Sequence, residues 1–587
     1  MTVHIKKYST FLTTAICASA LLSAPYLVPA TPDSPIFRTG SLTTLLLLAC
    51  FFPIKHALMH HSLRTLLYGG VFGLIFSVCL SLGAELLEYS ALLPGTGSMI
   101  RRLAVPFMMA PFIGILVSYL FVHKLSPCKR KHRSIPLAAF FLLFSLCYGA
   151  ILLALYPGVL SYDFAHEIDQ FTKGYFYAAH PVFHTLFLGS LFSLGETLFG
   201  SMTAGAALYH TVQLLLLSAI YAWACTFIEK RIPYRSVVLI LAGGFAFLPF
   251  HGVLAVSTSK DPLFAGLCTM LCLLLWEIAE NPTAFLNGYL RPLRFALCCL
   301  GISLLRHNGI FAYVPACIAL LLLCRCRYKK ALCVIFISIL LTVCIPKGLE
   351  SVVNAVWIPS TELMSVPCQQ LMRTARYGNL PEDEFTQIER WFPNATHTYK
   401  PHFADPAKGG NFNSNRYKKD PMDFWTTYAK YGLKYPRIYL EAFLENSTGL
   451  WYPDDTSHAH SLSNEDSDYI YLNTTYPFAP EQYPIEPGSK FPALQKILYT
   501  STHDSNHQKY PIISQLFCPA TYTFLLLLTT LLAFYHRRKP LALCTIPLWG
   551  IFISLLFSAG IFIRYAYPLM AAVPLLFSLM FFSPQKE

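Results

Sequence analysis

Residues 156–181, YPGVLSYDFAHEIDQFTKGYFYAAHP, separate two apolar runs and set the expectations for the rest of the chain. Polar and apolar residues recur in this segment at the spacing of an α-helix, which predicts an amphipathic helix. The residues concerned are Asp163, His166, Glu167 and Gln170 on one face, and Phe164, Ile168 and Phe171 on the other.

An amphipathic helix of this kind lies at a membrane surface, with its apolar face against lipid or protein and its carboxylates toward a cavity. Carboxylates held there bind a metal or take a proton from a hydroxyl group. A solvated connecting loop would carry the same residues, so the spacing alone leaves both interpretations open.

The composition identifies the class of protein. Hydrophobic residues make up 55% of the 587 residues and charged residues only 13%, with a mean hydropathy of +0.47. This excludes a water-soluble globular protein and predicts an all-α polytopic membrane protein. The net charge of +13 comes from short basic clusters between apolar runs, as membrane orientation requires, so we do not expect nucleic acid as a partner.

The cysteines do not predict disulfides. Most of the 18 lie inside apolar runs, where cysteine behaves as a small hydrophobic residue, and the long polar segment holds only Cys368. The first apolar run follows Lys6 and Lys7, and because many further runs follow it, we expect an uncleaved signal anchor.

The apolar runs predict about fourteen membrane crossings, with both termini in the cytoplasm of a cell membrane. The run at 181–200 is excluded, because its crossing would place the basic EKRIPYR (229–235) outside and because it contains His184 and Glu196. We expect it to be a re-entrant or interfacial helix. The crossing segments are 9–30, 41–59, 65–87, 103–122, 135–155, 205–228, 236–256, 262–279, 294–305, 310–324, 331–347, 516–535, 540–558 and 562–581.

This topology divides the chain into four parts. An N-terminal four-helix membrane extension (1–134) precedes a membrane module (135–347) whose first external loop is 156–204. A mostly helical extracytoplasmic domain (348–515) follows, because this segment has no apolar run of spanning length and is long enough to bury a core. Three membrane helices (516–587) end the chain.

Four charged features are expected at the outer face. Ionisable residues at the ends of membrane helices are costly unless they pair or line a wet cavity, so each is a candidate site. Snorkelling to the lipid headgroups is the alternative for the arginines. Acids and bases together suit a phosphate beside a hydroxyl group or a metal. The candidates are Asp163 with Glu167, Lys260 with Asp261, Arg306 with His307, and Arg564 with Tyr565.

The chain contains neither GxxxxGK[ST] nor GxGxxG between a strand and a helix. Their absence argues against coupling to ATP and against direct use of a cytoplasmic sugar nucleotide. A lipid-carried donor needs neither loop.

Several elements in order resemble the GT-C superfamily of membrane glycosyltransferases, in a bacterial branch known mainly as a domain of unknown function. The resemblance covers about 135–582 and rests on the order and spacing of its motifs. They are YPGVLSYD, AAHPVFHTLFLGSLFSLGETLFG, STSKDPLF, LLRHNGIFAYVP, LMSVPCQQLMR, FADPAK, GLWYPDD and IRYAYPL.

The resemblance implies inverting transfer of a sugar from a polyprenyl-phosphate donor to a glycan, lipid or protein acceptor at the outer membrane face. Asp163 matches the superfamily's loop acid, as a base on the acceptor hydroxyl or as a ligand of a divalent cation (Mg²⁺ or Mn²⁺). Arg306 and Arg564 would neutralise the leaving phosphate with help from Lys260, and Glu167 and His180 would shape the pocket. Asp163 is followed by Phe164 and Ala165, so it is not part of a D-x-D or D-D pair, which leaves metal dependence open.

The extracytoplasmic segment offers weaker candidates. Asp454 and Asp455 of WYPDD with His458 and His460 of HAH are candidate metal ligands, although a polar loop explains them better. Its tryptophans and tyrosines suit stacking on sugars, and equally a hydrophobic core.

Two other classes of protein fit the same features. A transporter would use charges along a substrate pathway, but it usually has internal repeats and charges at midmembrane, and neither is present in this sequence. A polysaccharide polymerase or ligase would use a pyrophosphate-linked oligosaccharide and would not depend on Asp163.

Overall fold

A computed structural model provides the structure, and the residues it describes are α-helical. They are 8–27, 49–92, 95–122, 134–161, 163–178, 181–356, 364–453, 484–486, 488–502 and 511–582. Within these ranges two isolated β-bridges are the only strand-like pairs, so the predicted all-α class is confirmed.

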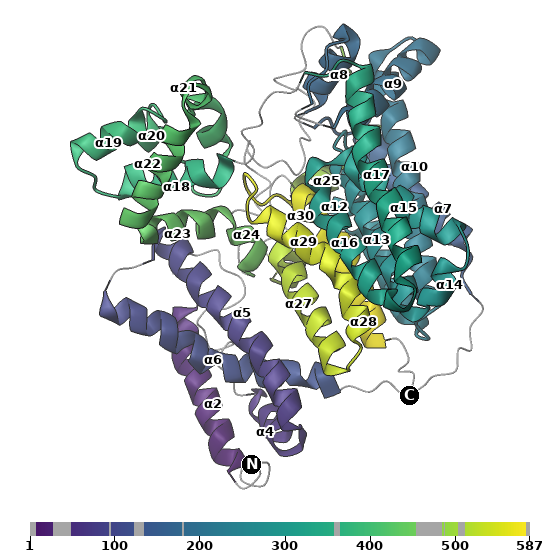
Figure 1. Cartoon of the computed structure of the whole chain (residues 1–587). Coiled ribbons are helices and arrows are strands. Elements are labelled where there is room, and N and C mark those ends of the chain that lie inside the picture. The colour runs from purple at the N-terminus through teal and green to yellow at the C-terminus, as the bar shows by residue number, and fades with distance from the viewer. Residues whose placement is uncertain are drawn as a thin grey trace.

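The N-terminal helices form a bundle with its own hydrophobic core (Figure 1). Trp451 and Tyr452, from far along the chain, complete this core. Gly83 allows the contact, because a Cβ there would lie 2.1 Å from the Tyr452 ring. The helices are α2 (Ser9–Ser23), α4 (Phe51–His60), α5 (Leu63–Tyr89) and α6 (Thr96–Val122).

The central bundle surrounds α13 (Asp261–Glu280) and the C-terminal α30 (Ile563–Phe582), whose most apolar stretches are 78% and 72% buried. α17 (Tyr328–Val352) is only 11% buried and lies at the periphery. The other helices are α7 (Leu137–Ala154), α8 (Phe164–Lys173), α9 (Val182–Phe199), α10 (Met202–Glu229), α11 (Arg235–Phe247), α12 (Pro249–Ala255), α14 (Pro282–Leu286), α15 (Leu290–Leu305), α16 (Ile310–Leu323), α25 (Pro492–Thr502), α26 (Pro511–Phe517), α27 (Pro519–Tyr535), α28 (Lys539–Ala542) and α29 (Ile546–Leu555).

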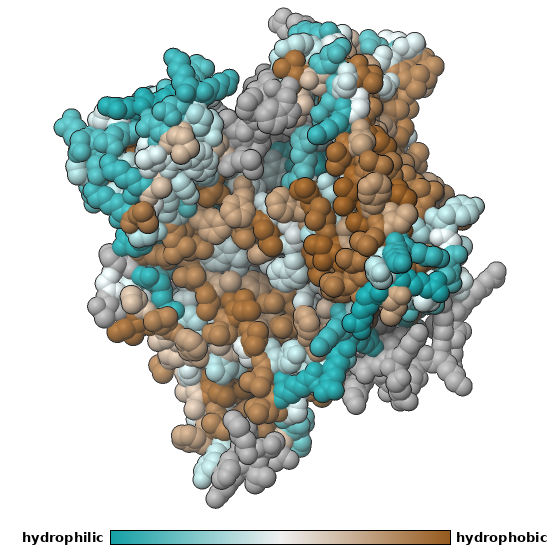
Figure 2. All heavy atoms as spheres, in the orientation of Figure 1, coloured by the Kyte–Doolittle hydropathy of each residue, from teal (hydrophilic) through white to brown (hydrophobic). Residues whose placement is uncertain are grey.

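Eight described helices are long and apolar enough to cross a membrane, or nine if the bent pair α11 and α12 forms one span. Four shorter apolar helices accompany them: 9–23, 307–323, 519–535 and 539–555. The chain is therefore a multi-pass membrane protein, and fourteen crossings remain a prediction. Figure 2 shows hydrophobic residues in a broad band across the helices, with polar residues above and below it.

The predicted span at 236–256 is not one straight helix. It bends by 54° between α11 and α12. Pro249 explains the bend, because proline lacks an N–H and excludes helical geometry from the residue before it; Leu248 is extended. The second half of the expected span thus becomes a short helix that leads to Ser257.

α9 is long and apolar enough to span, but its contacts with α10 involve only the first turns of that helix. Gly195 packs against Gly205, and His184 contacts Tyr209. The interfacial position expected for this segment remains a prediction.

A polar domain (364–446) lies at the top left of Figure 1 and packs around an aromatic core that includes Trp391 and Phe424. The described part of 484–502 lies elsewhere: Lys490 N donates to the Leu153 carbonyl at the end of α7. The helices of the domain are α18 (Ser365–Tyr377), α19 (Glu382–Glu389), α20 (Ala395–Thr398), α21 (Ser414–Lys419), α22 (Pro421–Lys434) and α23 (Pro436–Asn446), and α24 (Thr448–Trp451) follows.

The two ends of α13 define the two ends of the central bundle. The site end is where α13 begins, at Asp261. The basic end is where it finishes, about 30 Å away for its 20 residues. At the basic end Arg231 pairs with Glu280 (2.7 Å) and Arg291 with Glu277 (3.1 Å).

Candidate functional site

Two segments nearly 100 residues apart meet in parallel at the site end. Val159 N donates to the Val256 carbonyl (2.8 Å), and Thr258 N donates to the Val159 carbonyl (2.9 Å). Beyond this isolated bridge the two segments stay in contact through a side chain, because Ser161 N donates to Thr258 Oγ1 (2.7 Å). Each segment then begins a helix, and the N-cap residues Asp163 and Lys260 meet through their side chains (3.2 Å).

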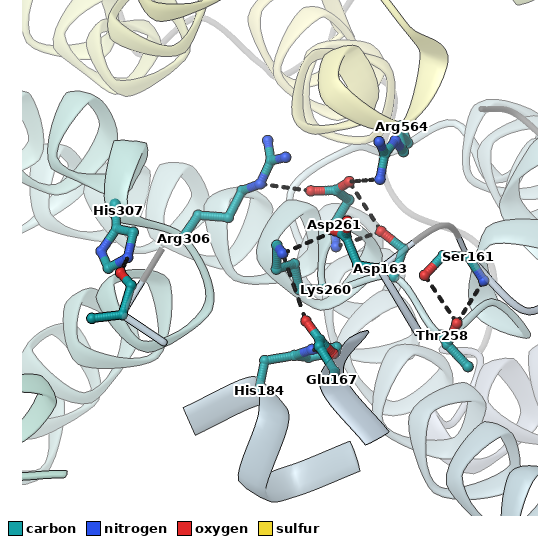
Figure 3. Close-up of polar contacts among 12 residues, drawn as sticks. Ser161, Asp163, Glu167, His184, Thr258, Lys260, Asp261, Arg306, His307 and Arg564 are labelled. Carbon is teal, nitrogen blue, oxygen red and sulfur yellow. Dashed lines mark hydrogen bonds and ion pairs between the residues drawn. The ribbon is translucent and has the colours of Figure 1, made fainter. Parts of the chain in front are cut away.

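Lys260 lies between two carboxylates (Figure 3). Its Nζ is 3.2 Å from Asp163 Oδ2 and 3.7 Å from Glu167 Oε1. Asp163 occupies the N-cap position of α8, but its side chain makes no capping hydrogen bond. The Asp163 carboxylate therefore pairs with Lys260 and does not cap the helix.

The predicted amphipathic helix at this segment is confirmed as α8, although its polar face is only partly solvated: His166 is exposed, whereas Gln170 is buried. Phe164 and Ile168 are buried as expected, and Glu167 is also only 1% exposed. The Asp163 side chain is 21% exposed. Of the two acids, Asp163 is therefore the one that a ligand can reach.

Asp261 holds the two arginines. Its Oδ1 is 2.7 Å from Arg306 Nε, and its Oδ2 is 3.8 Å from Arg564 Nη1 (Figure 3). Ser259 Oγ donates to Oδ2 (3.0 Å). Asp261 lies in the first turn of α13, where the positive end of the helix dipole favours a carboxylate.

Tyr565 lies between the arginines. Its ring centroid is 4.7 Å from Arg306 Cζ and 4.6 Å from Arg564 Cζ, within the range of cation–π contacts. Arg564 Nη2 also donates to the Tyr565 hydroxyl (3.0 Å). The site thus has an acidic side at Asp163 and a cationic side at Arg306 and Arg564, joined by adjacent Lys260 and Asp261.

Burial alone would raise the pKa of the Glu167 carboxyl. His184, through its charge and a hydrogen bond, and Lys260 outweigh this effect and hold the pKa below its ordinary value.

The remaining sequence candidates lie apart from this cluster or outside the described residues. His307 Nε2 contacts the Ala178 carbonyl (3.2 Å), and Figure 3 shows its ring away from the acids. It does not join the cluster, because the bridge between Tyr177 and Val356 holds Ala178 beside it. His180 and the metal candidates of 454–460 lie outside the described residues.

A buried hydrogen-bonded chain behind Glu167 is missing from the sequence-based candidates. Glu167 Oε2 is 2.7 Å from His184 Nδ1, and His184 Nε2 is 3.0 Å from the Tyr209 hydroxyl. Tyr209 donates in turn to Gln213 Oε1 (2.8 Å). In the sequence, the signal for this chain is His184 inside the apolar run 181–200, which by itself predicts only that the run does not cross the membrane.

No group of three or more His, Cys, Asp or Glu side chains in the described part of the chain is placed to hold a metal ion. The carboxylate of Asp163, the candidate ligand, is paired with Lys260. The described cysteines are all free, as expected.

The fold and the site define a multi-pass helical membrane protein with an acid and arginine cluster at one end of its bundle. The chain belongs to DUF6020, a family of unknown function, whose family model matches residues 159–587. The match begins at the bridge residue Val159 and leaves the N-terminal bundle outside. No curated protein and no solved structure matches the chain.

Proposed function

We propose that this protein is a membrane glycosyltransferase that moves a sugar from a polyprenyl-phosphate donor to an acceptor at the outer membrane face. One observation carries the proposal: a partly exposed carboxylate and two arginines, from three distant segments, meet at one end of the helical bundle. A carboxylate suits the hydroxyl that attacks, and arginines suit the phosphate that leaves.

In the proposed reaction, Asp163 takes the proton from the acceptor hydroxyl. The hydroxyl oxygen bonds to the anomeric carbon while the bond from that carbon to the phosphate oxygen breaks. Lys260 pairs with the Asp163 carboxylate until the acceptor arrives. The negative charge that develops on the phosphate is met by Arg306 and Arg564, which Asp261 and Tyr565 hold in place.

The test is sugar transfer by the purified protein in lipid, from a panel of radiolabelled polyprenyl-phosphate monosaccharides. Asp163→Asn keeps the shape of the side chain and removes its charge. Because a general base contributes roughly 10² to 10⁴ in rate, we expect transfer to fall at least about a hundredfold. Asp169→Asn is the matched control, because Asp169 lies on the same helix and pairs with the exposed Lys173.

Undiminished transfer by Asp163→Asn would remove this residue from the mechanism. Absence of transfer from every donor by the wild type would contradict the proposal as a whole. Transfer only from pyrophosphate-linked oligosaccharides would favour a polymerase or ligase.

A further inference from the structure

Four side chains in a row form a fully buried hydrogen-bonded chain behind the acidic side of the site. Glu167, His184, Tyr209 and Gln213 come from α8, α9 and α10, and none is more than 1% exposed. Buried polar groups are costly unless each donor meets an acceptor. The position of every hydrogen in the chain can therefore be worked out from its fixed end.

Gln213 is the fixed end. Its Nε2 faces three backbone carbonyls, those of Ser257 (2.5 Å), Ala255 (3.2 Å) and Leu254 (3.4 Å). Carbonyls only accept hydrogen bonds, so the nitrogen of the amide must be on this side. Gln213 Oε1 consequently faces Tyr209 and accepts from it.

The direction of each remaining bond follows. Tyr209 has one hydroxyl hydrogen and donates it to Gln213 Oε1 (2.8 Å), so its oxygen accepts from His184 Nε2 (3.0 Å). His184 Nε2 therefore carries a proton. The 2.7 Å contact between Nδ1 and Glu167 Oε2 needs a second proton. Lys260 Nζ lies 3.7 Å from the other Glu167 oxygen, and a cation at that distance favours the carboxylate form of Glu167, so that proton belongs to Nδ1.

We propose that His184 is doubly protonated in the folded protein and acts as a positioning residue, its positive charge holding the Glu167 carboxylate so that Lys260 is left to pair with Asp163. The distances agree, because Lys260 Nζ is nearer to Asp163 (3.2 Å) than to Glu167 (3.7 Å). A neutral residue at 184 would leave Glu167 to compete for the lysine.

A doubly protonated His184 also sets the charge of the site. The ion-paired side chains then comprise three carboxylates and four cations, which leaves one positive charge. This matches the single negative charge of a phosphate diester better than the two charges of a pyrophosphate diester. That consequence rests on the proposed function, whereas the protonation of His184 does not.

The test is nitrogen NMR of the full-length protein in lipid nanodiscs, labelled with [15N]histidine, at pH 7.5. The ring-nitrogen signals of His184 are identified as those that are present in the wild-type spectrum and absent from the spectrum of the His184→Gln variant. We expect both ring nitrogens to be protonated. His251 is the internal reference: its Nδ1 contacts the Tyr567 hydroxyl (2.7 Å) without any carboxylate partner in the described residues, so one of its nitrogens should be unprotonated.

Tyr209→Phe is a second test of the same proposal. If His184→Gln does not fold, the signals that shift in Tyr209→Phe identify the ring nitrogens of His184. It removes the acceptor of the Nε2 proton, so we expect an unprotonated nitrogen signal to appear. A neutral His184 in the wild type, or a spectrum unchanged by Tyr209→Phe, would overturn the proposal. Neither result depends on sugar transfer, so the proposed function stands or fails separately.

Discussion

Asp163 and Glu167 lie four residues apart on α8 and have different surroundings. Glu167 is buried against His184, whereas Asp163 is partly exposed beside Lys260. Their different exposure assigns the reacting role to Asp163 and a supporting role to Glu167. The two arginines also differ, because Arg306 lies closer to Asp261 than Arg564 does.

Arg306→Lys is expected to lower transfer more than Arg564→Lys. Arg306 lies 2.7 Å from Asp261, whereas Arg564 lies 3.8 Å from it. A lysine at position 306 would reproduce neither the planar fork of the arginine nor its stacking on Tyr565. A charged hydrogen bond contributes about 1.5–3 kcal/mol, which corresponds to roughly tenfold to a hundredfold in rate. The measurement is the initial rate of transfer from the active donor. Arg231→Lys, at the basic end, should leave that rate unchanged, and equal losses in all three variants would contradict the assignment.

The polar domain contains a second buried ionic cluster. Arg373 donates to Glu445 Oε2 and is 3.2 Å from Glu441 Oε2, and Leu92 N donates to Glu441 Oε1 (2.9 Å). The cluster therefore connects the polar domain to the loop after α5. Burial raises the pKa of the Glu445 carboxyl to about 7, in spite of the lowering effect of Arg373 and with the support of Glu441.

This raised pKa predicts that stability falls as the pH rises from about 4.5 to about 7. The folded protein keeps the Glu445 proton to a higher pH than the unfolded chain, whose glutamates titrate near 4.5. The slope is at most about 1.4 kcal/mol per pH unit. It should appear in the thermal midpoint of the full-length protein at pH 5, 6 and 7, and Glu445→Gln should remove its contribution.

Glu384→Gln is the control for this pH dependence. Hydrogen bonds from Lys434 and Tyr435 hold the pKa of Glu384 below its ordinary value, so it titrates below the tested window. An identical slope in the wild type and in Glu445→Gln would show that the slope has another origin.

At the scale of elements, the site depends on how three helices begin. α8 begins after Asp163, α13 begins at Asp261, and α30 begins at Ile563, next to Arg564. The bridge between Val159 and Ser257 sets the first two against each other. A disturbance of this bridge should therefore disturb the pairing of Asp163 with Lys260.

Gly158→Ala is the substitution that tests the bridge. Gly158 has a φ of +122°, and a Cβ there would lie 2.3 Å from the His210 ring. Backbone strain and overpacking together should cost about 2–4 kcal/mol. We expect a lower thermal midpoint and lower transfer. Gly149→Ala, in α7, meets nothing within 4 Å and should change neither. Equal effects of the two substitutions would contradict the role of the bridge.

At the scale of the whole molecule, the charges separate to opposite ends of the bundle. The acid and arginine cluster lies where α13 begins, and the pairs of Arg231 and Arg291 lie where α13 ends. In Figure 1 the polar domain and α8 lie at the top, and α14 and α28 lie lower down. From the positive-inside rule we expect the basic end to lie in the cytoplasm. The site end then faces outward, as the proposed function requires.

Cysteine labelling tests this orientation. Leu433→Cys, exposed in the polar domain, should react with an impermeant maleimide in sealed right-side-out vesicles. The native Cys326, exposed at the basic end, should react only after the vesicles are opened. Tagged peptides identified by mass spectrometry distinguish the two sites. Reaction of Cys326 in sealed vesicles without reaction of the cysteine at 433 would reverse the orientation and contradict transfer at the outer face.

The sequence by itself determined the helical membrane class, the amphipathic helix at 164–173 and most of the residues of the cluster. These follow from local periodicity and from the cost of placing charge near lipid, which do not depend on distant contacts. The bend before Pro249 is also encoded locally, but the continuous apolar run at 236–256 predicts a single straight span.

Only the tertiary structure decided which charges pair. Lys260 and Asp261 are adjacent in sequence, yet one contacts Asp163 and the other Arg306 and Arg564. His184 looked like a polar interruption in an apolar run until α10 placed Tyr209 and Gln213 behind it. The reason is physical: an ionic pair or a hydrogen bond acts over a few ångströms, and only packing determines which distant residues come that close.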